Sequence, residues 1–274
     1  MPEMPEVETI RRTLASKVEG RKIVCVDIGL PRLVKWPDAP EFKAVLTERV
    51  IIRLARRGKY LLFHLDNKMV LVIHLRMTGR LCYATTGVAQ DKFTHIVFGL
   101  DNGDSLLYAD TRTLGTLYLM PQEELWRING LATMGPEPLS EEFTLDYFSD
   151  MLSKRHAKIK SVLLNQKLIG GLGNIYVDEA LAVACLDPER TASSLTAREV
   201  KYLYQAVNQV IADGIAHGGT TFRDYRDGEG QRGSHQKYLK VYGRVNEPCQ
   251  RCGAIIARKE VAGRGTHYCP NCQK

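Results

Sequence analysis

The stretch MVLVIHLRM (residues 69–77) is one of a series of short apolar runs that fill the first half of the chain. These runs are rich in β-branched and aromatic residues, and turn-forming Gly, Asp and Asn separate them, as in DNGD (residues 101–104). Closely spaced strands with turn signals indicate an antiparallel sandwich or barrel. The runs that we interpret as strands span residues 22–30, 49–55, 59–65, 69–77, 94–100, 105–110 and 116–120.

Helix patterns flank this β region. Val7, Ile10 and Leu14 recur at helical spacing before it, and helix signals dominate after the Pro/Gly-marked junction MGPEPLS (residues 134–140). We expect further helices over residues 158–166, 174–186 and 195–219, with Thr196 and Glu199 as a capping box, and a polar loop over 220–233. The chain is therefore predicted to be an α+β protein of two domains with a small C-terminal appendage, divided at 1–131, 132–235 and 236–274.

Charge and composition limit the partners of the protein. The chain has 274 residues and a net charge of +7, with no apolar run near the ~20 residues of a membrane helix and no basic-then-apolar leader. A cytoplasmic location is the default expectation. The stretch SKRHAKIKSVLLNQ (residues 153–166) carries five basic side chains and no acid, which favours a polyanionic partner over a merely basic surface.

Four of the seven cysteines form two close pairs near the end of the chain: Cys249, Cys252, Cys269 and Cys272. This C-x2-C…C-x2-C spacing is typical of zinc, because each tight turn presents two thiolates and two turns complete a tetrahedron. Two disulfides or a redox pair are the alternatives. Four protein ligands leave no open coordination position, so we expect one structural Zn²⁺. Between the pairs, residues 254–268 read as a β-hairpin with Arg258, Lys259, Arg264 and His267 available for a polyanion.

The remaining cysteines, Cys25, Cys82 and Cys185, are isolated in apolar surroundings, and we expect them to be buried thiols. A different signal is the Gly-rich turn of IGGLGNIYVDEAL (residues 169–181), which leads into a helix with Asn174 in its first turn. Such a helix start is a natural phosphate site, although a plain helix–helix turn is the alternative. The preceding Lys158 and Lys160 favour a DNA backbone.

The chain begins MPEMPEVETI (residues 1–10). Removal of Met1 would expose the secondary amine of Pro2, and an α-amino group has a reference pKa of about 7.7–8.0, far below that of lysine. Such an amine can attack an aldehyde-like carbon and form a cationic iminium. Glu3 could then shuttle protons and Glu6 could orient the amine. A frayed acidic terminus is the alternative.

The order of these motifs resembles the bacterial formamidopyrimidine-DNA glycosylase family, the 8-oxoguanine branch of the Fpg/Nei superfamily. The resemblance spans the whole chain. It rests on PEMPEVET (2–9), RRGKYLL (56–62), HLRMTG (74–79), GPEPL (135–139), GLGNIYVDEAL (171–181), VYGR (241–244) and VAGRGTHYCPNCQ (261–273). It implies an N-terminal β-sandwich flanked by helices, a helical domain with a helix–two-turn–helix motif, and a zinc-finger β-hairpin.

The resemblance also implies an activity and its residues. The protein would be a monomeric base-excision repair glycosylase and abasic-site lyase on double-stranded DNA with damaged bases, associated with the bacterial nucleoid. Pro2 would attack C1′ of the damaged nucleotide and Glu3 would donate protons, while Lys59 and Arg264 would serve in β- and δ-elimination. The resemblance assigns DNA contacts to His74, His95, Arg112, Lys160 and Asn174, with Arg264 also on phosphate. The damaged base would be flipped out of the stack. The residues implied to fill the void that it leaves in the duplex are Met77, Arg112 and Leu114. The loop implied to cap the flipped base contains Thr221, Arg223, Asp224 and Tyr225.

Three departures from the usual family pattern involve four positions. Met4 replaces a Leu of similar shape. Thr113 and Leu114 stand where a basic residue and an aromatic residue are usual. Leu114 can therefore act as a wedge in the duplex, but it cannot stack on a base as an aromatic ring does. The positive charge usual at position 113 is lost. Asp224 lies in a loop that varies with lesion preference. Two alternatives stay open: an oxidised-pyrimidine preference of the Nei type, favoured by Leu114 but not by Met4, and a lesion-binding protein with weak turnover.

Overall fold

The computed structural model describes residues 1–87 and 91–274, which form two compact units. Unit 1 contains Met1–Ala132 and His217–Ser234, and unit 2 contains Thr133–Ala216 and His235–Lys274. These units do not follow the chain segments expected from the sequence. The loop after residue 216 packs with the N-terminal part because its backbone is bonded there: the amide of Gly228 donates to Thr13 Oγ1 at 3.0 Å, and its carbonyl accepts from Tyr83 N at 2.7 Å.

Unit 1 is built on a nine-stranded sheet in the order β2-β9-β5-β4-β3-β1-β7-β8-β6. The pairings are antiparallel except for β2 and β9, which are parallel with Val34 opposite Leu117. All seven expected strands are present. The strands are β1 (Lys22–Ile28), β2 (Val34–Trp36), β3 (Arg49–Arg57), β4 (Tyr60–Leu65), β5 (Met69–His74), β6 (Gly79–Ala84), β7 (Thr94–Leu100), β8 (Ser105–Asp110) and β9 (Thr116–Pro121).

The sequence did not reveal two of these strands. β2 has three residues, two of them exposed, and β6 begins at a glycine with little apolar alternation. Both are strands because a neighbour pairs with them, β9 for the first and β8 for the second. Such pairing is a tertiary effect that local propensity does not contain.

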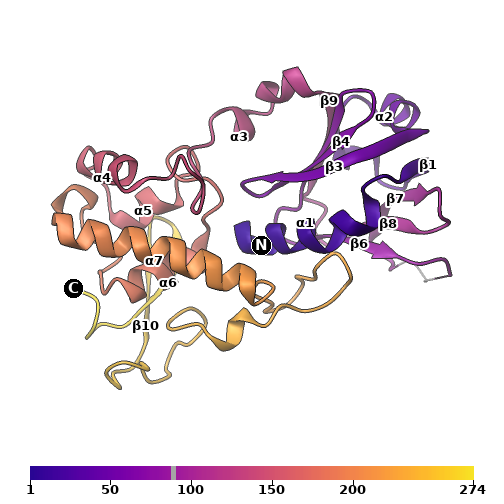
Figure 1. Cartoon of the computed structure of the whole chain (residues 1–274). Helices are drawn as coiled ribbons and strands as arrows, with labels where there is room; N and C mark the ends of the chain where they lie inside the picture. Colours follow the sequence, from indigo (N-terminus) through magenta and orange to yellow (C-terminus); the bar gives the residue numbers. More distant parts are fainter. Residues whose placement is uncertain (88–90) are drawn as a thin grey trace. The chain divides into compact units, whose positions relative to one another are not determined.

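The two halves of this sheet share one hydrophobic core with the first helix. Leu54 and Phe63 from β3 and β4 belong to the same buried cluster as Phe98 from β7, so the sheet closes over common side chains. Helix α1 (Met4–Val18) places Ile10 and Leu14 in this cluster and packs on β3 (Figure 1). The other helical elements are η1 (Pro31–Leu33), α2 (Ala39–Leu46), η2 (Gln122–Arg127) and α3 (Asn129–Ala132).

Unit 2 is helical apart from its terminal hairpin. Helices α6 (Asn174–Val183) and α7 (Ala197–Ala216) lie side by side (Figure 1), with so little space between them that a Cβ on Gly214 would come within 2.6 Å of the Tyr176 ring. The expected capping box is present, since Thr196 N donates to Glu199 at 2.8 Å. The elements are α4 (Leu145–Ser153), α5 (Ile159–Leu164), α6 (Asn174–Val183), η3 (Ala192–Ser194), α7 (Ala197–Ala216), η4 (His235–Lys237), β10 (Ala257–Val261) and β11 (Arg264–Tyr268).

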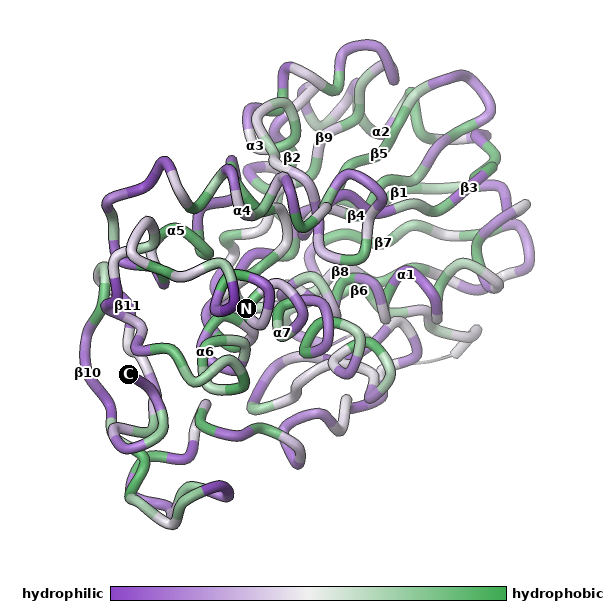
Figure 2. Tube along the Cα trace, turned by 60° about the vertical axis from the view of Figure 1, so that its left-hand side comes forward, coloured by the Kyte–Doolittle hydropathy of each residue, from purple (hydrophilic) through white to green (hydrophobic). Residues whose placement is uncertain are grey.

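Hydropathy follows this organisation. Strands β4 and β5 are hydrophobic along most of their length in Figure 2, whereas many connecting loops are hydrophilic. Among the described helices none combines the length and the apolar character needed to cross a membrane. The expectation of buried thiols was wrong for Cys25, which is exposed, and Cys82 and Cys185 are only partly buried. Cys25 pairs with Gly99 on the neighbouring strand, and because Gly99 has no side chain the sulfur of Cys25, which lies over it, stays exposed.

Candidate active site

The amino terminus is an ordered part of unit 1. Residues 2–6 are buried, with Glu3 at 3 % and Glu6 at 1 % exposure. Glu6 holds this segment at two points: its Oε2 accepts from the amide of Glu3 at 2.8 Å, and its Oε1 accepts from the amide of Thr220 at 2.7 Å. A carboxylate held by two amides fixes the chain on both sides of it. A frayed acidic terminus is therefore excluded.

Glu6 also fixes the stem of the loop that was expected to cap a base. Tyr225 donates its hydroxyl hydrogen bond to the Glu6 carbonyl at 3.3 Å or to the Gly218 carbonyl at 3.1 Å, and burial raises its pKa. Gly219 has φ +81, and a Cβ there would meet the Glu6 side chain at 3.0 Å. Only glycine tolerates both conditions, which explains the Gly-Gly pair at the helix end.

The loop stem and its apex have different environments. Thr221 and Tyr225 are buried, and the Thr221 hydroxyl accepts from Gly233 N at 3.0 Å. Arg223 and Asp224 are exposed at the apex, next to Phe222, which is half exposed. The stem is thus fixed while the apex presents an aromatic, a cation and an anion. Sequence reasoning did not single out Phe222, although an aromatic in a polar loop is a readable signal.

Lys59 and His74 lie at the same end of the β4–β5 hairpin, where Tyr60 pairs with His74. Lys59 follows Gly58, whose φ of +56 makes the tight turn. His74 accepts from Arg76 N through Nδ1 at 3.0 Å, so its Nε2 carries the proton. Burial, and then the nearby cations Arg76 and Lys59, lower the pKa of His74 to about 3. The imidazole is therefore a neutral donor at neutral pH.

One buried carboxylate organises the three residues expected to fill the void. Asp110 is fully buried at the end of β8. Its Oδ1 accepts from the Thr78 hydroxyl at 2.5 Å and from Arg112 N at 3.2 Å, while its Oδ2 accepts from Gly115 N at 2.9 Å. Met77 and Leu114 therefore flank residues that Asp110 holds. Sequence reasoning missed Asp110, because no local motif marks it.

The side chains of these loops face solvent. Leu114 is 47 % and Met77 44 % exposed, and Arg112 Nη1 donates to the sulfur of Met77 at 3.2 Å. His95 is partly buried on β7, where its Nε2 lies 2.9 Å from the Asp110 carbonyl. Apolar side chains on an anchored loop are suited to insertion between bases.

Unit 2 carries Lys160, Asn174 and Arg264. Lys160 was expected on a phosphate, but the structure contradicts a direct contact. Its side chain has 0 % exposure, and its ammonium donates to Asp178 at 2.5 Å and to Thr266 Oγ1 at 2.8 Å. A basic run in the sequence cannot show that one of its lysines has a buried carboxylate opposite it. Lys160 instead links α5, α6 and β11.

Asn174 begins α6, as expected, and its Nδ2 donates to the Gly265 carbonyl at 2.9 Å. Its Oδ1 is buried and has no partner among the described residues. Arg264 is exposed beside the Ala262–Gly263 turn, where both residues have positive φ. The helix start is thereby joined to the turn end of the hairpin, next to Arg264.

Two of the four basic hairpin residues, Lys259 and His267, interact with carboxylates of unit 2. Lys259 pairs with Asp187 at 3.0 Å and with Glu189 at 2.9 Å. The backbone amide of His267 donates to Asp178 Oδ2 at 2.8 Å, and His267 Nδ1 lies 3.2 Å from the same oxygen. The expectation that all four are available to a polyanion was therefore wrong. Arg258 and Arg264 remain exposed.

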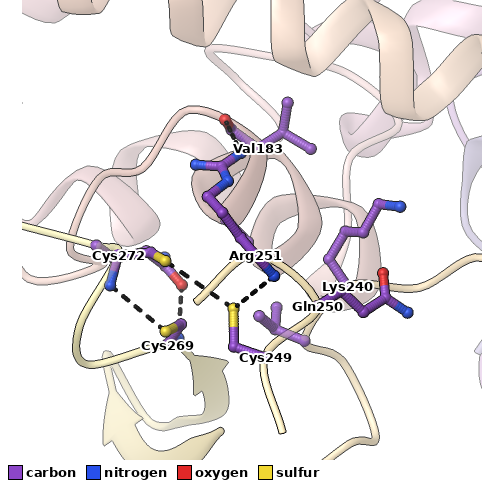
Figure 3. Close-up of a pocket in the computed structure, with 10 residues that line it drawn as sticks. Val183, Lys240, Cys249, Gln250, Arg251, Cys269 and Cys272 are labelled. Atoms are coloured by element: carbon purple, nitrogen blue, oxygen red, sulfur yellow. Dashed lines mark hydrogen bonds between the residues drawn. The ribbon is translucent and has the colours of Figure 1, made fainter. Parts of the chain in front are cut away.

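The four terminal cysteines form a cluster whose sulfur atoms all lie within 4.8 Å of one another. Cys249 and Cys272 are 3.9 Å apart through sulfur, and Cys252 and Cys269 are 3.5 Å apart. Tetrahedral Zn–S bonds of about 2.3 Å require sulfur separations of about 3.8 Å, so the donor set fits Zn²⁺. Figure 3 shows Arg251 extending from this knuckle toward Val183, whose carbonyl accepts at 3.4 Å.

Sequence reasoning also missed Asp178 and Glu179, which lie on the buried face of α6. Glu179 accepts from three consecutive backbone amides at 2.6, 2.9 and 2.8 Å, those of Lys240, Val241 and Tyr242. The adjacent acids within an otherwise apolar helix are the signal that could have revealed them. Such carboxylates require partners because unpaired buried charge is costly.

Comparison with known proteins places these features in one family. Residues 1–117 match the formamidopyrimidine-DNA glycosylase N-terminal domain, residues 134–226 its H2TH domain, and residues 246–274 the zinc finger found in FPG and IleRS. The formamidopyrimidine-DNA glycosylase of Heliobacterium modesticaldum is 50 % identical over 277 residues, with 100 % of both chains covered. That of Pelotomaculum thermopropionicum is 47 % identical over 274 residues, covering 100 % of this chain and 99 % of the relative.

Solved structures agree with this result. A complex between the Lactococcus lactis Fpg and an abasic site containing DNA has a TM-score of 0.94 at 38 % identity, with 100 % of both chains covered. The wild-type Lactococcus lactis Fpg with an N7-benzyl-Fapy-dG containing DNA has a TM-score of 0.93 at the same identity and coverage. The fold and site define a DNA-repair glycosylase with a zinc finger. The chain belongs to the formamidopyrimidine-DNA glycosylase family.

Proposed function

We propose that this protein excises oxidised purines, 8-oxoguanine and formamidopyrimidines, from duplex DNA and then cleaves the strand at the abasic site. The observation that carries the proposal is the buried, doubly anchored amino terminus, in which Glu6 fixes both Glu3 and the loop at Thr220. A chain end held in this way can present an amine at a defined position. Relatives named formamidopyrimidine-DNA glycosylase over the whole chain support the same activity.

The proposed chemistry starts from Pro2 after removal of Met1. The secondary amine attacks C1′, the C1′–N bond to the base breaks, and the base leaves with a proton supplied by Glu3. The substituted amine then loses its proton, and its lone pair expels O4′ from C1′, so that the sugar ring opens and O4′ takes up a proton. The iminium formed in this way is cationic and serves as the electron sink for loss of a C2′ proton and of the 3′ phosphate. Lys59 and Arg264 would assist the successive β- and δ-eliminations, and the damaged base must be flipped out of the stack first.

The remaining site residues have supporting roles in the proposal. His74 donates its Nε2–H to phosphate, and the exposed Arg264 adds charge. The buried Lys160 is reassigned to positioning the hairpin that carries Arg264. Met77, Arg112 and Leu114 enter the void, with Arg112 facing the base of the other strand, while residues Phe222 to Asp224 cover the flipped base. The enzyme would act as a monomer in the bacterial cytoplasm, on nucleoid DNA.

Borohydride trapping on an 8-oxoguanine duplex tests the nucleophile. Protein whose measured mass shows that Met1 has been removed should give an adduct that maps to Pro2. A chain that carries one extra residue before Pro2 should give no adduct. Glu3→Gln should lower base excision by about 10²–10⁴-fold yet retain cleavage of a preformed abasic site, where no base must be protonated. Glu41→Gln, an exposed first-turn glutamate of α2, is the matched control. An adduct on a lysine would refute the proposal.

Lesion preference needs a separate measurement. The aliphatic and exposed Leu114 keeps an oxidised-pyrimidine preference under consideration. Competition between 8-oxoguanine and thymine glycol duplexes decides between the two classes, and faster excision of thymine glycol would reassign the substrate. Binding of damaged DNA without any trapped adduct would instead identify a lesion-binding protein with weak turnover.

A further inference from the structure

Arg32 contacts the loop that carries the void-filling residues. Its Nη2 donates to the hydroxyl of Thr113 at 2.6 Å, although the two residues are 81 positions apart in the chain. The register of the sheet explains the contact. Because β2 and β9 run parallel with Val34 opposite Leu117, the residues that precede these strands lie alongside each other. Arg32 is in η1, immediately before β2.

Thr113 has an unfavourable backbone conformation. Its φ is +51, a region that β-branched residues rarely adopt. A loop residue in this state persists only where its surroundings hold it. Thr113 N lies 3.3 Å from the Asp110 carbonyl, at the upper end of hydrogen-bond lengths, so the shorter Arg32 contact is the better-formed bond at this residue.

The anchors of this loop leave a defined gap. Asp110 binds the amides of Arg112 and Gly115, so Thr113 and Leu114 span the interval between its two carboxylate oxygens. The hydrogen bond from Arg32 holds Thr113, which lies between the two residues whose amides Asp110 binds. It also places a guanidinium beside a position where the family usually has a basic side chain and this chain has threonine.

We propose that Arg32 is a positioning residue for recognition of the strand opposite the lesion, acting through Thr113. The bond holds Arg112 and Leu114 in the arrangement that enters the duplex, so less ordering is needed on binding. The inference rests on the proposed function for its substrate. A simple phosphate contact by Arg32 is the competing explanation, and it predicts a different result.

Four variants separate these explanations. Arg32→Gln removes the guanidinium, and Thr113→Val removes the hydroxyl at nearly constant shape. Arg32→Lys retains the positive charge and a donor group but loses the planar guanidinium. The double variant Arg32→Gln/Thr113→Val tests whether the two residues act through one bond. Arg21→Gln is the matched control, because this exposed arginine lies near Asp101 at the other end of the β7–β8 hairpin.

The first measurement is single-turnover excision of 8-oxoguanine opposite cytosine and opposite adenine. We expect Arg32→Gln and Thr113→Val each to change the ratio of the two rates by about fivefold, which corresponds to about 1 kcal/mol for one exposed charge-assisted bond. The double variant should show no further change. Arg32→Lys should restore at least part of the ratio, and Arg21→Gln should leave it unaltered.

The second measurement does not depend on catalysis. Amide hydrogen exchange of residues 112–115 in the free protein should accelerate in Arg32→Gln and Thr113→Val but not in Arg21→Gln. Faster exchange with an unchanged rate ratio would overturn the inference.

Uniform weakening of DNA binding by Arg32→Gln, with a salt slope reduced by about 1 and no effect of Thr113→Val, would identify a phosphate contact and likewise overturn it. Absence of excision by the wild-type protein would instead overturn the proposed function itself.

Discussion

The Lys160–Asp178 ion pair lies wholly inside unit 2, with neither side chain exposed. Burying two charges is costly, and their attraction offsets that cost only with good geometry and further hydrogen bonds. Both conditions hold, since Thr266 accepts from the ammonium and the His267 amide donates to the carboxylate. The pair therefore fixes how β11 sits on α6, and through β11 the hairpin that presents Arg264.

Lys160→Met should destabilise unit 2 by about 3–5 kcal/mol, because Asp178 would remain as an uncompensated buried charge. The exposed pair Lys154–Asp150 provides the control, and Lys154→Met should cost about 0.5 kcal/mol or less. Denaturant unfolding of both variants measures the difference. Equal stabilities would show that the buried pair contributes no more than a surface pair.

His74 and Glu8 make the stability of unit 1 sensitive to acid. The pKa of His74 is lowered from 6.5 to about 3, chiefly by burial. Burial would raise the pKa of Glu8, but hydrogen bonds from Arg11 and Arg12 lower it to about 2. In both cases the unfolded chain binds more protons, so stability is lost as the pH falls: from about 6.5 for the histidine and from about 4.5 for the glutamate.

The melting temperature should therefore decrease steadily from pH 7 to pH 4. His74→Asn should remove the upper part of this decrease, about 2 kcal/mol between pH 6.5 and pH 5, and flatten the profile there. The exposed His156 is the control, and His156→Asn should keep the wild-type profile. Thermal melts over this range measure both, and a profile unchanged by His74→Asn would contradict the assignment.

At the scale of elements, Asp110 connects the β5–β6 turn to the β8–β9 turn. Its two oxygens accept from Thr78 on one side and from Gly115 on the other. Gly115 is packed so closely that an added Cβ would meet the Tyr108 hydroxyl at 1.6 Å. The two turns are therefore one structural feature, although 32 residues separate Thr78 from Asp110.

Asp110→Asn should destabilise unit 1 by about 1–3 kcal/mol. In either orientation of the new side chain, its NH2 group would face a hydrogen-bond donor in place of one carboxylate oxygen. We expect excision to fall as well, because Met77 and Leu114 would lose their common anchor. Asp101→Asn, an exposed change in the turn of the same hairpin, is the comparison and should have a smaller effect. Thermal unfolding and excision rates together report the outcome. An Asn variant as stable as wild type would show that the carboxylate is not required.

For the whole molecule, zinc determines whether the last segment folds. The stretch from residue 246 onward contains a two-stranded hairpin and contributes Ile256 and Cys269 to a small buried cluster that also includes Val241. Two strands alone are marginally stable in water. Structural zinc contributes about 10–16 kcal/mol in comparable sites and can supply what the core lacks.

Cys272→Ser should therefore abolish stoichiometric zinc and strongly weaken binding to damaged DNA, as should a chelator acting on the wild-type protein. Cys25→Ser removes an exposed thiol outside the cluster and should retain both zinc and binding. Metal analysis and DNA titration measure the two properties. Full DNA affinity in a zinc-free variant would contradict this role for the segment.

Several features followed from the sequence because their causes are local. Two cysteines in one tight turn form half of a zinc site wherever the turn lies, and strand or helix periodicity depends on neighbouring residues. The capping box of Thr196 and Glu199 is local in the same way. The family motifs likewise identified Pro2, Glu3 and Lys59 as candidate catalytic residues.

Only the tertiary structure decided what depends on distant partners. The burial of Lys160 requires Asp178 and Thr266, the conformation of Thr113 is held by Arg32, and Glu6 anchors the terminus through Thr220. None of these contacts leaves a periodic or spaced pattern in the chain. The physical reason is that the charge or hydrogen bond at each residue is satisfied by a group brought near it by folding.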